Sequence, residues 1–385
     1  MTSSRRGQWQ TAAEILTRVS REPGITRAAV AHELGLSSSS ATEVTAKLRD
    51  LHLLSETPAP SRGRGRPTTL LQAHPSGPLA LVLDLRQSNW RSAVVALDGS
   101  FLSQDDRRHR TRRPQVVLGN LRRAVTDAQD QYGARLQVVG LAVPGTLRDK
   151  YMLQASALEW FEMDLDSVTA GTDVPLLVGN DATLSGVAEA RTGASVGAGT
   201  ALHLIIEAGI GGALLIDGVP IQGASGAGGE FGHTPFGDRS RLCPCGARGC
   251  WNLEIDGRAL ARHLRDPEPD DPHTYTHAVL ARTDSAARHA VEQVVTAIAS
   301  GIAGLVNAHD PDVVTLGGLA VPLRAAAEQT FTTAYLEGLM SFRRAAPPPV
   351  LVAAHQSDGP LRGAAALALD HLTTEHAIAT WAATH

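Results

Sequence analysis

Apolar side chains recur at helical spacing in three short stretches near the N-terminus, which predicts three consecutive helices. The first helix covers residues 9–20. The second begins directly after Thr26, whose hydroxyl can cap it. It ends at Gly35, where the left-handed backbone conformation suits glycine. The third begins behind Ser37 or Ser38. A tight glycine-containing turn between the second and third helices indicates a helix-turn-helix.

A β-hairpin is predicted directly after these helices. Residues 53–57 and 69–72 form its two strands, and residues 61–67 between them carry three arginines separated by glycines. A hairpin behind a helix-turn-helix makes a winged helix, and a narrow cationic tip of this kind can enter an A·T-rich minor groove. We therefore predict a winged helix-turn-helix over residues 1–75 that binds a double-stranded DNA operator.

The residues expected to contact DNA lie on the outer face of the third helix and at the tip of the wing. Short hydroxyls at the N-terminal end of a recognition helix can meet base edges or phosphates, and arginines contact the DNA backbone. The predicted set is Ser38, Ser39, Ser40, Thr42, Glu43, Lys47, Arg62, Arg64 and Arg66. A solvated helix face followed by a basic linker is the alternative, and the combination of three helices with a wing argues against it.

The remaining sequence, residues 76–385, alternates strands and helices and contains a repeated pattern. Residues 80–99 form a strand, a polar turn, a second strand and an Asp-Gly turn, and residues 201–218 repeat this order. Two such units, each opening an α/β region, predict a duplicated domain with two similar lobes and a cleft between them.

Several predicted strands of this domain end in Gly, Asn or Asp. Residues 138–143 precede Gly145, and residues 176–178 precede Asn180 and Asp181. Because ligands of α/β sheets gather at the carboxyl ends of the strands, these three residues are candidates for a binding site.

Composition narrows the class of protein. The chain has 385 residues and a formal net charge of −4. Residues 1–75 carry ten Lys and Arg against six Asp and Glu, a balance of +4, so the rest carries −8. A basic head on an acidic body fits a DNA-binding module, and ordinary variation of surface charge is the alternative. No apolar run reaches the roughly 18 residues of a membrane span, and the polar N-terminus lacks a signal-peptide core. We expect a cytoplasmic protein without membrane contact, in which the apolar stripe at 286–308 is a core helix.

All three cysteines lie in one short segment, with a histidine nearby. His233 precedes Cys243, Cys245 and Cys250. Clustered cysteines in a cytosolic chain indicate a metal rather than a disulfide, and one His with three Cys satisfies a tetrahedral zinc. Because such a site uses all four coordination positions, the zinc is expected to be structural and not catalytic. Three buried free thiols are the alternative.

With these residues in place, nearly the whole chain resembles the ROK family of repressors, uncharacterised reading frames and sugar kinases, in its transcription-factor branch. The motifs that carry the resemblance are Gly65-Arg66-Pro67, Val143-Pro144-Gly145, Gly179-Asn180-Asp181-Ala182, Gly229-Glu230-Phe231-Gly232-His233, the Cys-x-Cys-Gly-x-x-Gly-Cys run at 243–250, and Leu316-Gly317-Gly318. Each is weak alone, and together they are specific. The resemblance implies an α/β fold with two actin/hexokinase-like lobes, a structural zinc, and a homodimer or homotetramer.

The resemblance also implies roles for residues between the lobes. In the kinases, the aspartate matching Asp181 is the base that takes the proton of the sugar hydroxyl, and residues matching Asn180, Glu230 and His233 hold sugar hydroxyls. The family's histidine binds zinc through one ring nitrogen and sugar through the other, so the zinc sets the ring's tautomer. The effector-binding residues expected here are Gly145, Asn180, Asp181, Glu230, His233 and Asn252.

Three positions depart from the kinase pattern. The first phosphate motif, Asp-x-Gly-Gly-Thr in the kinases, is Asp84-Leu85-Arg86-Gln87-Ser88 here, so side chains replace glycines that let backbone N–H groups approach a phosphate. The second, Gly-Thr-Gly in the kinases, is Glu207-Ala208-Gly209 and places a negative charge where phosphates should lie. Asn252 stands where the kinases have a sugar-contacting glutamate, and Glu254 is out of register.

These departures predict that Asp181 is a vestigial base and that kinase activity is lost. We expect a non-enzymatic repressor of sugar or secondary carbon metabolism, gated by a sugar or sugar-phosphate effector in the interlobe cleft. Arg86 leaves anion binding open, and Asn252 leaves the identity of the sugar open. The alternatives are a bifunctional ATP-dependent sugar kinase and regulator, and a DNA-binding regulator that ignores sugars and responds to a protein partner or to no ligand.

Overall fold

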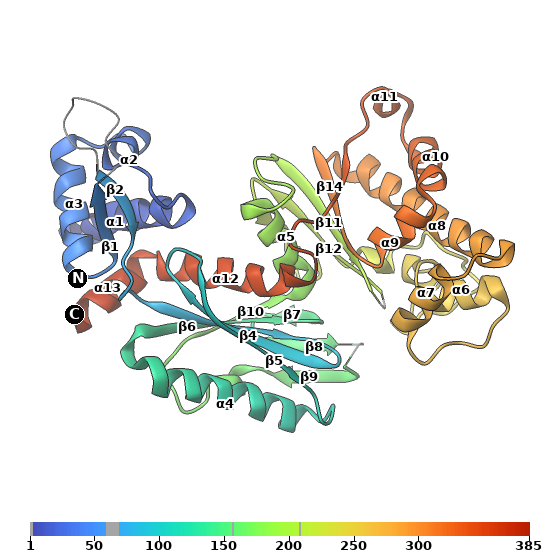
Figure 1. Cartoon of the computed structure of the whole chain (residues 1–385), viewed down its shortest axis with the longest axis horizontal. Coiled ribbons are helices and arrows are strands. Elements are labelled where there is room, and N and C mark those ends of the chain that lie inside the picture. Colours follow the sequence, from blue (N-terminus) through green and yellow to red (C-terminus); the bar gives the residue numbers. More distant parts are fainter. Residues whose placement is uncertain (1–2, 59–68, 156–157, 208) are drawn as a thin grey trace.

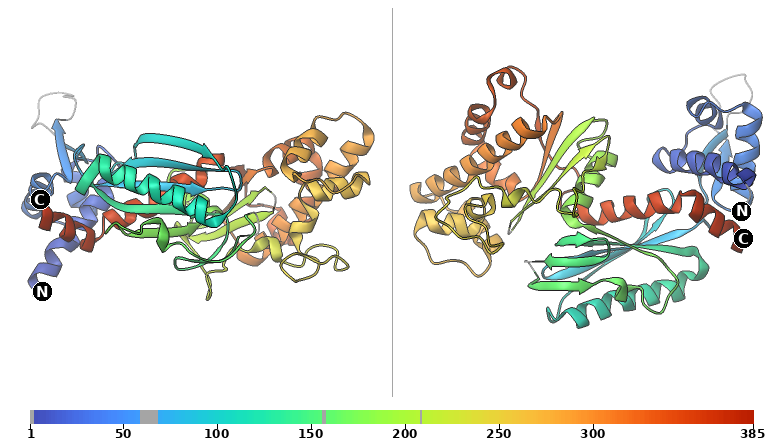
Figure 2. Two further views of the ribbon diagram at one scale, coloured as in Figure 1. Left: turned by 90° about the horizontal axis from the view of Figure 1, so that it is seen from below. Right: turned by 180° about the vertical axis from the view of Figure 1, so that it is seen from behind.

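A computed structural model describes residues 3–58, 69–155, 158–207 and 209–385 of the chain. A small N-terminal head lies at one end of a body that consists of two lobes, each built on its own five-stranded sheet (Figure 1). The C-terminal helix packs against the first helix of the head (Figures 1 and 2). The predicted fold class, a winged head followed by a two-lobed α/β domain, is confirmed.

The head contains three helices and a hairpin. In chain order these are α1 (Ser3–Arg21), α2 (Arg27–Glu33), α3 (Ser38–Asp50), β1 (Leu54–Pro58) and β2 (Thr69–Ala73). Thr26 caps α2 by accepting a hydrogen bond from the Ala29 N–H at 3.0 Å, and Ser37 caps α3 through the Ser40 N–H at 3.1 Å. Gly35, between the two helices, has a φ of +63°, a left-handed conformation that glycine adopts without strain.

The head differs from its sequence prediction at one point. α1 begins at Ser3, earlier than the predicted residue 9, because the polar stretch before the apolar stripe continues the helix. In α3, Thr45 is buried together with Ala41 and Leu48, and the half-buried Val44 packs against the same core. The Thr45 hydroxyl donates to the Ala41 carbonyl at 2.7 Å, so its burial leaves no polar group unpaired.

The wing strands begin and end within about one residue of their predicted bounds, and they pair antiparallel along their whole length. The tip between them includes Arg62, Arg64 and Arg66, and these three residues lie outside the described part of the chain.

The sheet of the first lobe has the strand order β10-β6-β3-β4-β5. Its strands are β3 (Leu79–Leu85), β4 (Asn89–Ala96), β5 (Phe101–Arg108), β6 (Leu136–Val143) and β10 (Leu176–Asn180). Helix α4 (Pro114–Tyr132) covers one face of this sheet, and α12 (Gly359–Leu372) covers the other (Figure 1). A small sheet flanks it, made of β7 (Thr146–Arg148), β8 (Tyr151–Ala155) and β9 (Trp160–Asp164).

The sheet of the second lobe has the order β13-β12-β11-β14-β15. Its strands are β11 (Thr200–Ile206), β12 (Ile210–Ile216), β13 (Val219–Pro220), β14 (Val313–Gly318) and β15 (Val350–Val352). Helix α5 (Asp181–Thr192) packs on one face. The other helices of this lobe are α6 (Gly257–Leu264), α7 (Pro272–Leu280), α8 (Ser285–His309), α9 (Ala320–Ala326), α10 (Glu328–Gly338) and α11 (Ser341–Arg344).

The two sheets have the same topology, which confirms the predicted duplication. In each sheet, the first strand pairs antiparallel with the second and parallel with a later one. The Asp-Gly turns that close the two hairpins also correspond, since Gly99 and Gly218 have φ values of +79° and +77°. Each turn therefore uses glycine where a side chain would be strained.

Helix α8 fills the core of the second lobe, as the apolar stripe predicted. Among the described residues it is the one helix long and apolar enough to cross a membrane, with 61% of its apolar window buried inside the protein. Val294, Ile298 and Ile302 on its inner face are at most 1% exposed. Its hydrophobicity is thus used in packing against the sheet and neighbouring helices.

Helices α5 and α12 pack against each other where the two lobes meet. Their backbones touch, because a Cβ on Gly363 of α12 would collide with the Leu184 carbonyl of α5, and one on Gly359 would lie 2.8 Å from the Ser185 hydroxyl. The two lobes are therefore joined through a close helix pair.

The head is joined to the body by the last helix, α13 (Glu375–Thr384). Ile378 and Trp381 of α13 share one hydrophobic cluster with Leu16 of α1 and Leu48 of α3. The Trp381 indole N–H donates to the carbonyl of Leu51, the residue that ends α3, at 2.7 Å. The core of the head is thus completed by residues from the far end of the chain.

Candidate functional site

The four predicted metal ligands come together in one cluster. His233 ends a short 3-10 helix (Phe231–His233), and the three cysteines lie on the loop that follows it. The potential ligand atoms of His233, Cys243, Cys245 and Cys250 all lie within 4.8 Å of one another. The described cysteines are free thiols, so none is used in a disulfide.

The spacing within the cluster fits a tetrahedral zinc. A tetrahedron with Zn–S bonds of about 2.3 Å has S–S edges of about 3.8 Å, and an edge to a histidine nitrogen is slightly shorter. The Sγ atoms of Cys245 and Cys250 are 3.6 Å apart, and the Cys243 Sγ lies 3.7 Å from the His233 Nδ1. The donor set and its dimensions therefore suit this metal, and the ligand on the histidine side is Nδ1.

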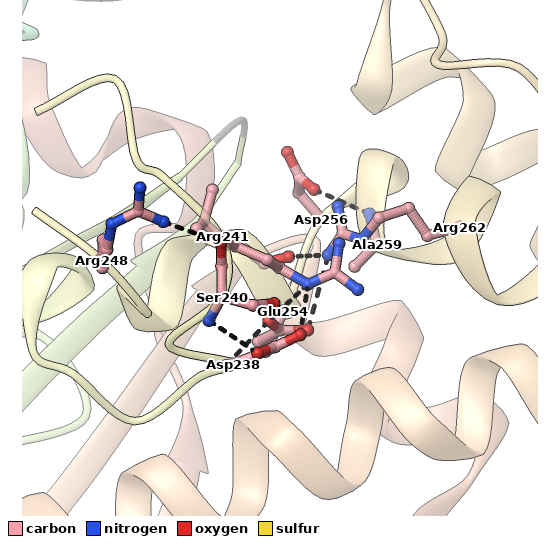
Figure 3. A network of polar contacts seen from close by, with 9 residues as sticks. Asp238, Ser240, Arg241, Arg248, Glu254, Asp256, Ala259 and Arg262 are labelled. Atoms are coloured by element: carbon pink, nitrogen blue, oxygen red, sulfur yellow. Dashed lines mark hydrogen bonds and ion pairs between the residues drawn. The ribbon is translucent and has the colours of Figure 1, made fainter. Parts of the chain in front are cut away.

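A network of charges holds the cysteine loop to the helices behind it (Figure 3). Glu254 is at its centre, with Arg241 at 3.5 Å on one side and Arg262 at 3.5 Å on the other. Arg262 also donates to the Leu253 carbonyl, and the Arg248 guanidinium donates to a loop carbonyl at 2.9 Å. Glu254 is thus occupied in anchoring the loop.

Asn180 organises the junction between β10 and α5. Its Oδ1 accepts the Thr183 N–H at 3.0 Å and so caps α5, and its Nδ2 donates to the Gly145 carbonyl at 3.1 Å. Asp181 is the first residue of that helix, and its Oδ1 accepts the Ala182 N–H at 2.8 Å. The amide of Asn180 therefore fixes the positions of Gly145 and Asp181 relative to each other.

Glu230 and His233 approach this junction from the second lobe. The Thr146 hydroxyl, next to Gly145, donates to the Glu230 Oε1 at 2.7 Å. The Glu230 Oε2 lies 3.9 Å from the His233 Nε2. Because Nδ1 faces the cysteines, Nε2 is the nitrogen that points toward Glu230 and is available for a ligand.

Asn252 contacts the same region from the segment that follows the last cysteine. Its Oδ1 accepts the N–H of Ile210, the first residue of β12, at 2.6 Å. It also packs against Gly232, directly before His233. The next residue of β12, Gly211, lies against Ala182, where a Cβ would approach the alanine Cβ to 2.6 Å. Asn252 thus links the histidine to the start of α5.

The six residues predicted to bind an effector therefore lie in one place, although the sequence spreads them over more than 100 positions. We call Gly145, Asn180, Asp181, Glu230, His233 and Asn252 the interlobe site. The sequence prediction missed Thr146, which connects the lobes through Glu230. The only available signal for it was its position directly after Gly145.

Asp181 has an unusual acidity. Desolvation is the main cause that raises its pKa to about 7, and the nearby Asp84 carboxylate adds to the effect, while the Ala182 N–H and Arg86 oppose it. Asp84 is itself buried, and burial raises its pKa despite the neighbouring Arg86. A carboxyl group with a pKa near 7 can exchange protons with a bound hydroxyl at neutral pH.

Arg86 lies in the segment predicted to correspond to the kinases' first phosphate motif. Its Nε donates to Asp84 Oδ2 at 2.7 Å, and its Nη2 donates to the Ser357 carbonyl. The other carboxylate oxygen of Asp84 is buried without a hydrogen-bond partner. The guanidinium therefore neutralises part of the buried charge of Asp84.

The segment predicted to correspond to the second phosphate motif carries the Glu207 side chain. The Glu207 carboxylate lies 3.3 Å from the His273 Nε2, at the beginning of α7. The backbone N–H of Glu207 donates to the Gly209 carbonyl at 2.9 Å, so this amide is used within the loop. Ala208 between them lies outside the described residues.

The outer face of α3 presents the predicted DNA-contacting residues. Ser38, Ser39, Ser40, Thr42 and Glu43 are exposed. Two of the serine hydroxyls, those of Ser39 and Ser40, lie within 2.9 Å of the capping hydroxyl of Ser37.

Lys47 occupies a different position on α3. Its ammonium lies over the Trp9 ring of α1, 3.9 Å from the ring centre, so it stiffens the contact between these helices as well as adding positive charge.

Comparison with known proteins gives a consistent result. The model of the ROK family matches residues 81–371, which is most of the body. The xylose repressor of Bacillus subtilis (strain 168) is 23% identical over 310 residues, which cover 78% of this chain and 80% of that protein. A glucokinase of Streptomyces coelicolor is 25% identical over 261 residues, which cover 62% and 81%. Regulators and kinases are therefore relatives at similar distances.

A solved structure extends the likeness to the head. The crystal structure of a ROK family transcriptional regulator, described as a homolog of the E. coli Mlc protein, superposes with a TM-score of 0.80 at 21% identity. The match covers 98% of this chain and 99% of that one. The shared fold thus includes the N-terminal extension as well as the two lobes.

Proposed function

The chain belongs to the ROK family, with the layout of its repressor-like transcriptional regulators, and on that premise we propose that it is a DNA-binding repressor controlled by a sugar-like effector. The observation that carries the proposal is the combination of a winged head with an interlobe site whose phosphate loops are filled by Arg86 and Glu207. The head supplies DNA binding, and the interlobe site supplies the response to a metabolite.

The interlobe site suits a polyhydroxylated ligand. Carboxylates, an amide and an imidazole nitrogen can accept from and donate to adjacent hydroxyls in pairs. Glu230 and His233 Nε2 are 3.9 Å apart, a spacing that lets both groups bind neighbouring hydroxyls of one sugar ring. Zinc, held by His233 Nδ1 and the three cysteines, would orient the imidazole for this contact. We infer that the effector is a sugar or a sugar phosphate.

Phosphoryl transfer is not part of the proposed function. Catalysis of that reaction requires backbone N–H groups that surround the phosphates of the nucleotide. In this chain the first loop carries the Arg86 side chain bonded to Asp84, and the second carries the Glu207 carboxylate. Asp181 keeps the environment of a general base, but no phosphate is transferred in the proposed function. We therefore assign Asp181 to effector binding.

The complete proposal includes further partners. The winged heads of a homodimer or homotetramer would bind two half-sites of a double-stranded operator near genes of sugar or secondary carbon metabolism, in the cytoplasm. An effector that binds one arrangement of the lobes more tightly than another would shift the spacing of the heads and so change operator affinity.

The first experiment identifies the DNA and the effector. The full-length, zinc-loaded protein is used to select duplexes from a randomised pool, and affinity for the selected duplex is measured by fluorescence anisotropy with and without D-xylose and D-glucose. A sugar that binds the folded protein also raises its melting temperature by mass action. We expect a specific duplex, and a sugar whose effect is the same with and without Mg-ATP.

Substitutions in the wing test DNA binding, and substitutions in α4 serve as their matched control. Replacing Arg64 and Arg66 together by Ala should weaken binding at least tenfold, and should reduce the slope of log affinity against log salt by about 2, because two phosphate contacts are lost. Replacing the exposed Arg122 and Arg123 of α4 by Ala removes the same charge from the body and should change neither. Failure to select any duplex would contradict the repressor function.

A bifunctional kinase and regulator is the second candidate, because Asp181 has the raised pKa of a general base. It predicts ADP release when a sugar and Mg-ATP are added together. Sugar-dependent ADP release that is lost in Asp181→Asn would establish this activity and would mean that the altered phosphate loops still bind nucleotide.

A further inference from the structure

One segment of the chain is held by both lobes at once. Residues 353–358 connect β15 to α12. From the second lobe's helix α5, the Glu189 carboxylate accepts the N–H groups of Ala354 at 2.9 Å and His355 at 2.8 Å. From the first lobe's sheet, Arg91 donates to the Asp358 carboxylate at 2.7 Å. A change in the angle between the lobes must therefore act on this segment and on the start of α12.

Helix α12 continues from this segment along α5 toward the head. At its start the two backbones touch through Gly359 and Gly363. Near its end the Arg191 guanidinium of α5 donates to both oxygens of Asp370, at 2.7 and 2.6 Å, and to the Ala366 carbonyl at 3.0 Å. The helix that begins at Asp181 of the interlobe site thus holds α12 at both ends.

Asp370 has a second cationic neighbour, which belongs to the head. The Arg21 guanidinium, at the end of α1, lies 3.7 Å from the Asp370 Oδ1. The adjacent residue of α1, Ser20, donates from its hydroxyl to the Leu97 carbonyl of the first lobe at 2.8 Å. Beyond Asp370, α13 enters the core of the head, where Trp381 donates to Leu51 at the end of α3. One carboxylate therefore lies between the effector-site helix and the DNA-binding head.

We propose that Asp370 is a positioning residue that couples the interlobe site to the DNA-binding head, by joining Arg191 of α5 to Arg21 of α1 on the rod formed by α12 and α13. This inference rests on the proposed function for its biological meaning. An effector that turns α5 moves Arg191, and the shared carboxylate and the rod carry that movement to α1 and α3. The coupling is energetic as well as geometric, because Arg191 holds the Asp370 carboxylate in the position where its Oδ1 also attracts Arg21.

The test uses Asp370→Asn, which removes the charge and keeps the side-chain size, and Arg191→Met, which removes the guanidinium and keeps an unbranched apolar stem. The control is Arg282→Met, because Arg282 also holds an aspartate with two hydrogen bonds, at 2.9 and 3.2 Å, on the second lobe. Sugar binding by calorimetry should stay within about twofold of the wild type. The factor by which the sugar changes operator affinity should fall about two- to fivefold in both variants, the range expected for partly exposed ion pairs, and should be unchanged in the control.

Hydrogen–deuterium exchange provides a readout that needs neither DNA nor sugar. Arg191→Met should increase exchange of the α1 amides between Trp9 and Arg21, although residue 191 lies on another element, and Arg282→Met should not. If exchange in the head is unchanged in Arg191→Met, the proposed coupling is wrong, whatever the sugar does. If the wild-type protein itself binds no operator or ignores the sugars while the exchange result holds, the proposed function fails and the mechanical link stands.

Discussion

At the scale of single residues, the environment of Asp181 decides its chemistry more than its identity does. Loss of water and the neighbouring Asp84 raise its pKa to about 7 from a usual value of 3.8. The same residue on an open surface would be ionised throughout the physiological range. Burial and the nearby Asp84 create this difference, whereas the start of α5 opposes it through the Ala182 N–H.

The raised pKa predicts a pH-dependent stability. Between about pH 4 and pH 7 the folded protein holds the Asp181 proton and the unfolded chain does not, so this group's contribution to stability is present at low pH and is lost as pH rises through about 7. Asp181→Asn removes the titration. The unfolding free energy of the wild type, measured by urea denaturation, should therefore fall relative to that of the variant by a few kcal/mol from pH 4.5 to pH 8.

The gap between wild type and variant is the informative quantity, because carboxylates that do not interact with Asp181 titrate equally in both proteins. A gap that stays constant over this pH range would show that Asp181 is ionised in the folded state. It would also remove the argument that this residue resembles a poised base.

At the scale of elements, the loop between His233 and Cys250 has little regular structure and depends on cross-links. Its backbone is held by the Glu254 network (Figure 3). Its four potential ligand atoms lie within 4.8 Å of one another. Charge pairs at a partly exposed position contribute little each. Zinc is therefore expected to be the main source of order in this loop and to fix the orientation of His233.

Replacing one ligand tests this dependence. Cys245→Ala should lower the zinc content, measured by elemental analysis of purified protein, from about one per chain to a small fraction, because three ligands do not satisfy a structural tetrahedral site. Sugar binding should weaken with it, since His233 loses its fixed position. Arg239→Ala, on the same loop but outside the cluster, should keep its zinc. Full zinc content in Cys245→Ala would refute the ligand assignment.

At the scale of the whole molecule, the head and the body form one hydrophobic unit. The cluster that contains the core of the head continues through α13 and α12 to the first lobe's sheet. The DNA affinity of a winged helix on a flexible linker would be independent of the arrangement of the lobes. A winged helix fused to a lobe in this way must reorient when that lobe moves, which is the geometric requirement for control by an effector.

Truncating Trp381, which joins the head to the body, should separate the thermal unfolding of the head from that of the body. Trp381→Ala leaves a cavity at the seam and should cost about 3–5 kcal/mol, mostly in the attachment of the head. Calorimetry should then resolve a low-temperature transition of the head before that of the body. Trp160→Ala is the matched control, because Trp160 is equally buried and its indole N–H donates to the Arg112 carbonyl at 2.9 Å, within the first lobe. A single shifted transition in Trp381→Ala would contradict the prediction.

Much of the molecule was determined by the sequence through short-range rules. The helices of the head, their caps at Thr26 and Ser37, and the two similar hairpins follow from patterns within a few residues, because capping, turn formation and periodic burial are local. The metal cluster was equally predictable, since its ligands lie within 18 positions of one another and their chemistry is distinctive.

Only the tertiary structure decided which distant side chains meet. Glu254 joins two arginines and not the interlobe site, Thr146 bonds Glu230 across the lobes, and Trp381 reaches Leu51 over 330 positions. These contacts depend on how sheets and helices pack. Chemistry alone would allow each of these side chains several different polar partners. A sequence pattern specifies what a residue can bind, and the packing of the lobes and the head specifies what it does bind.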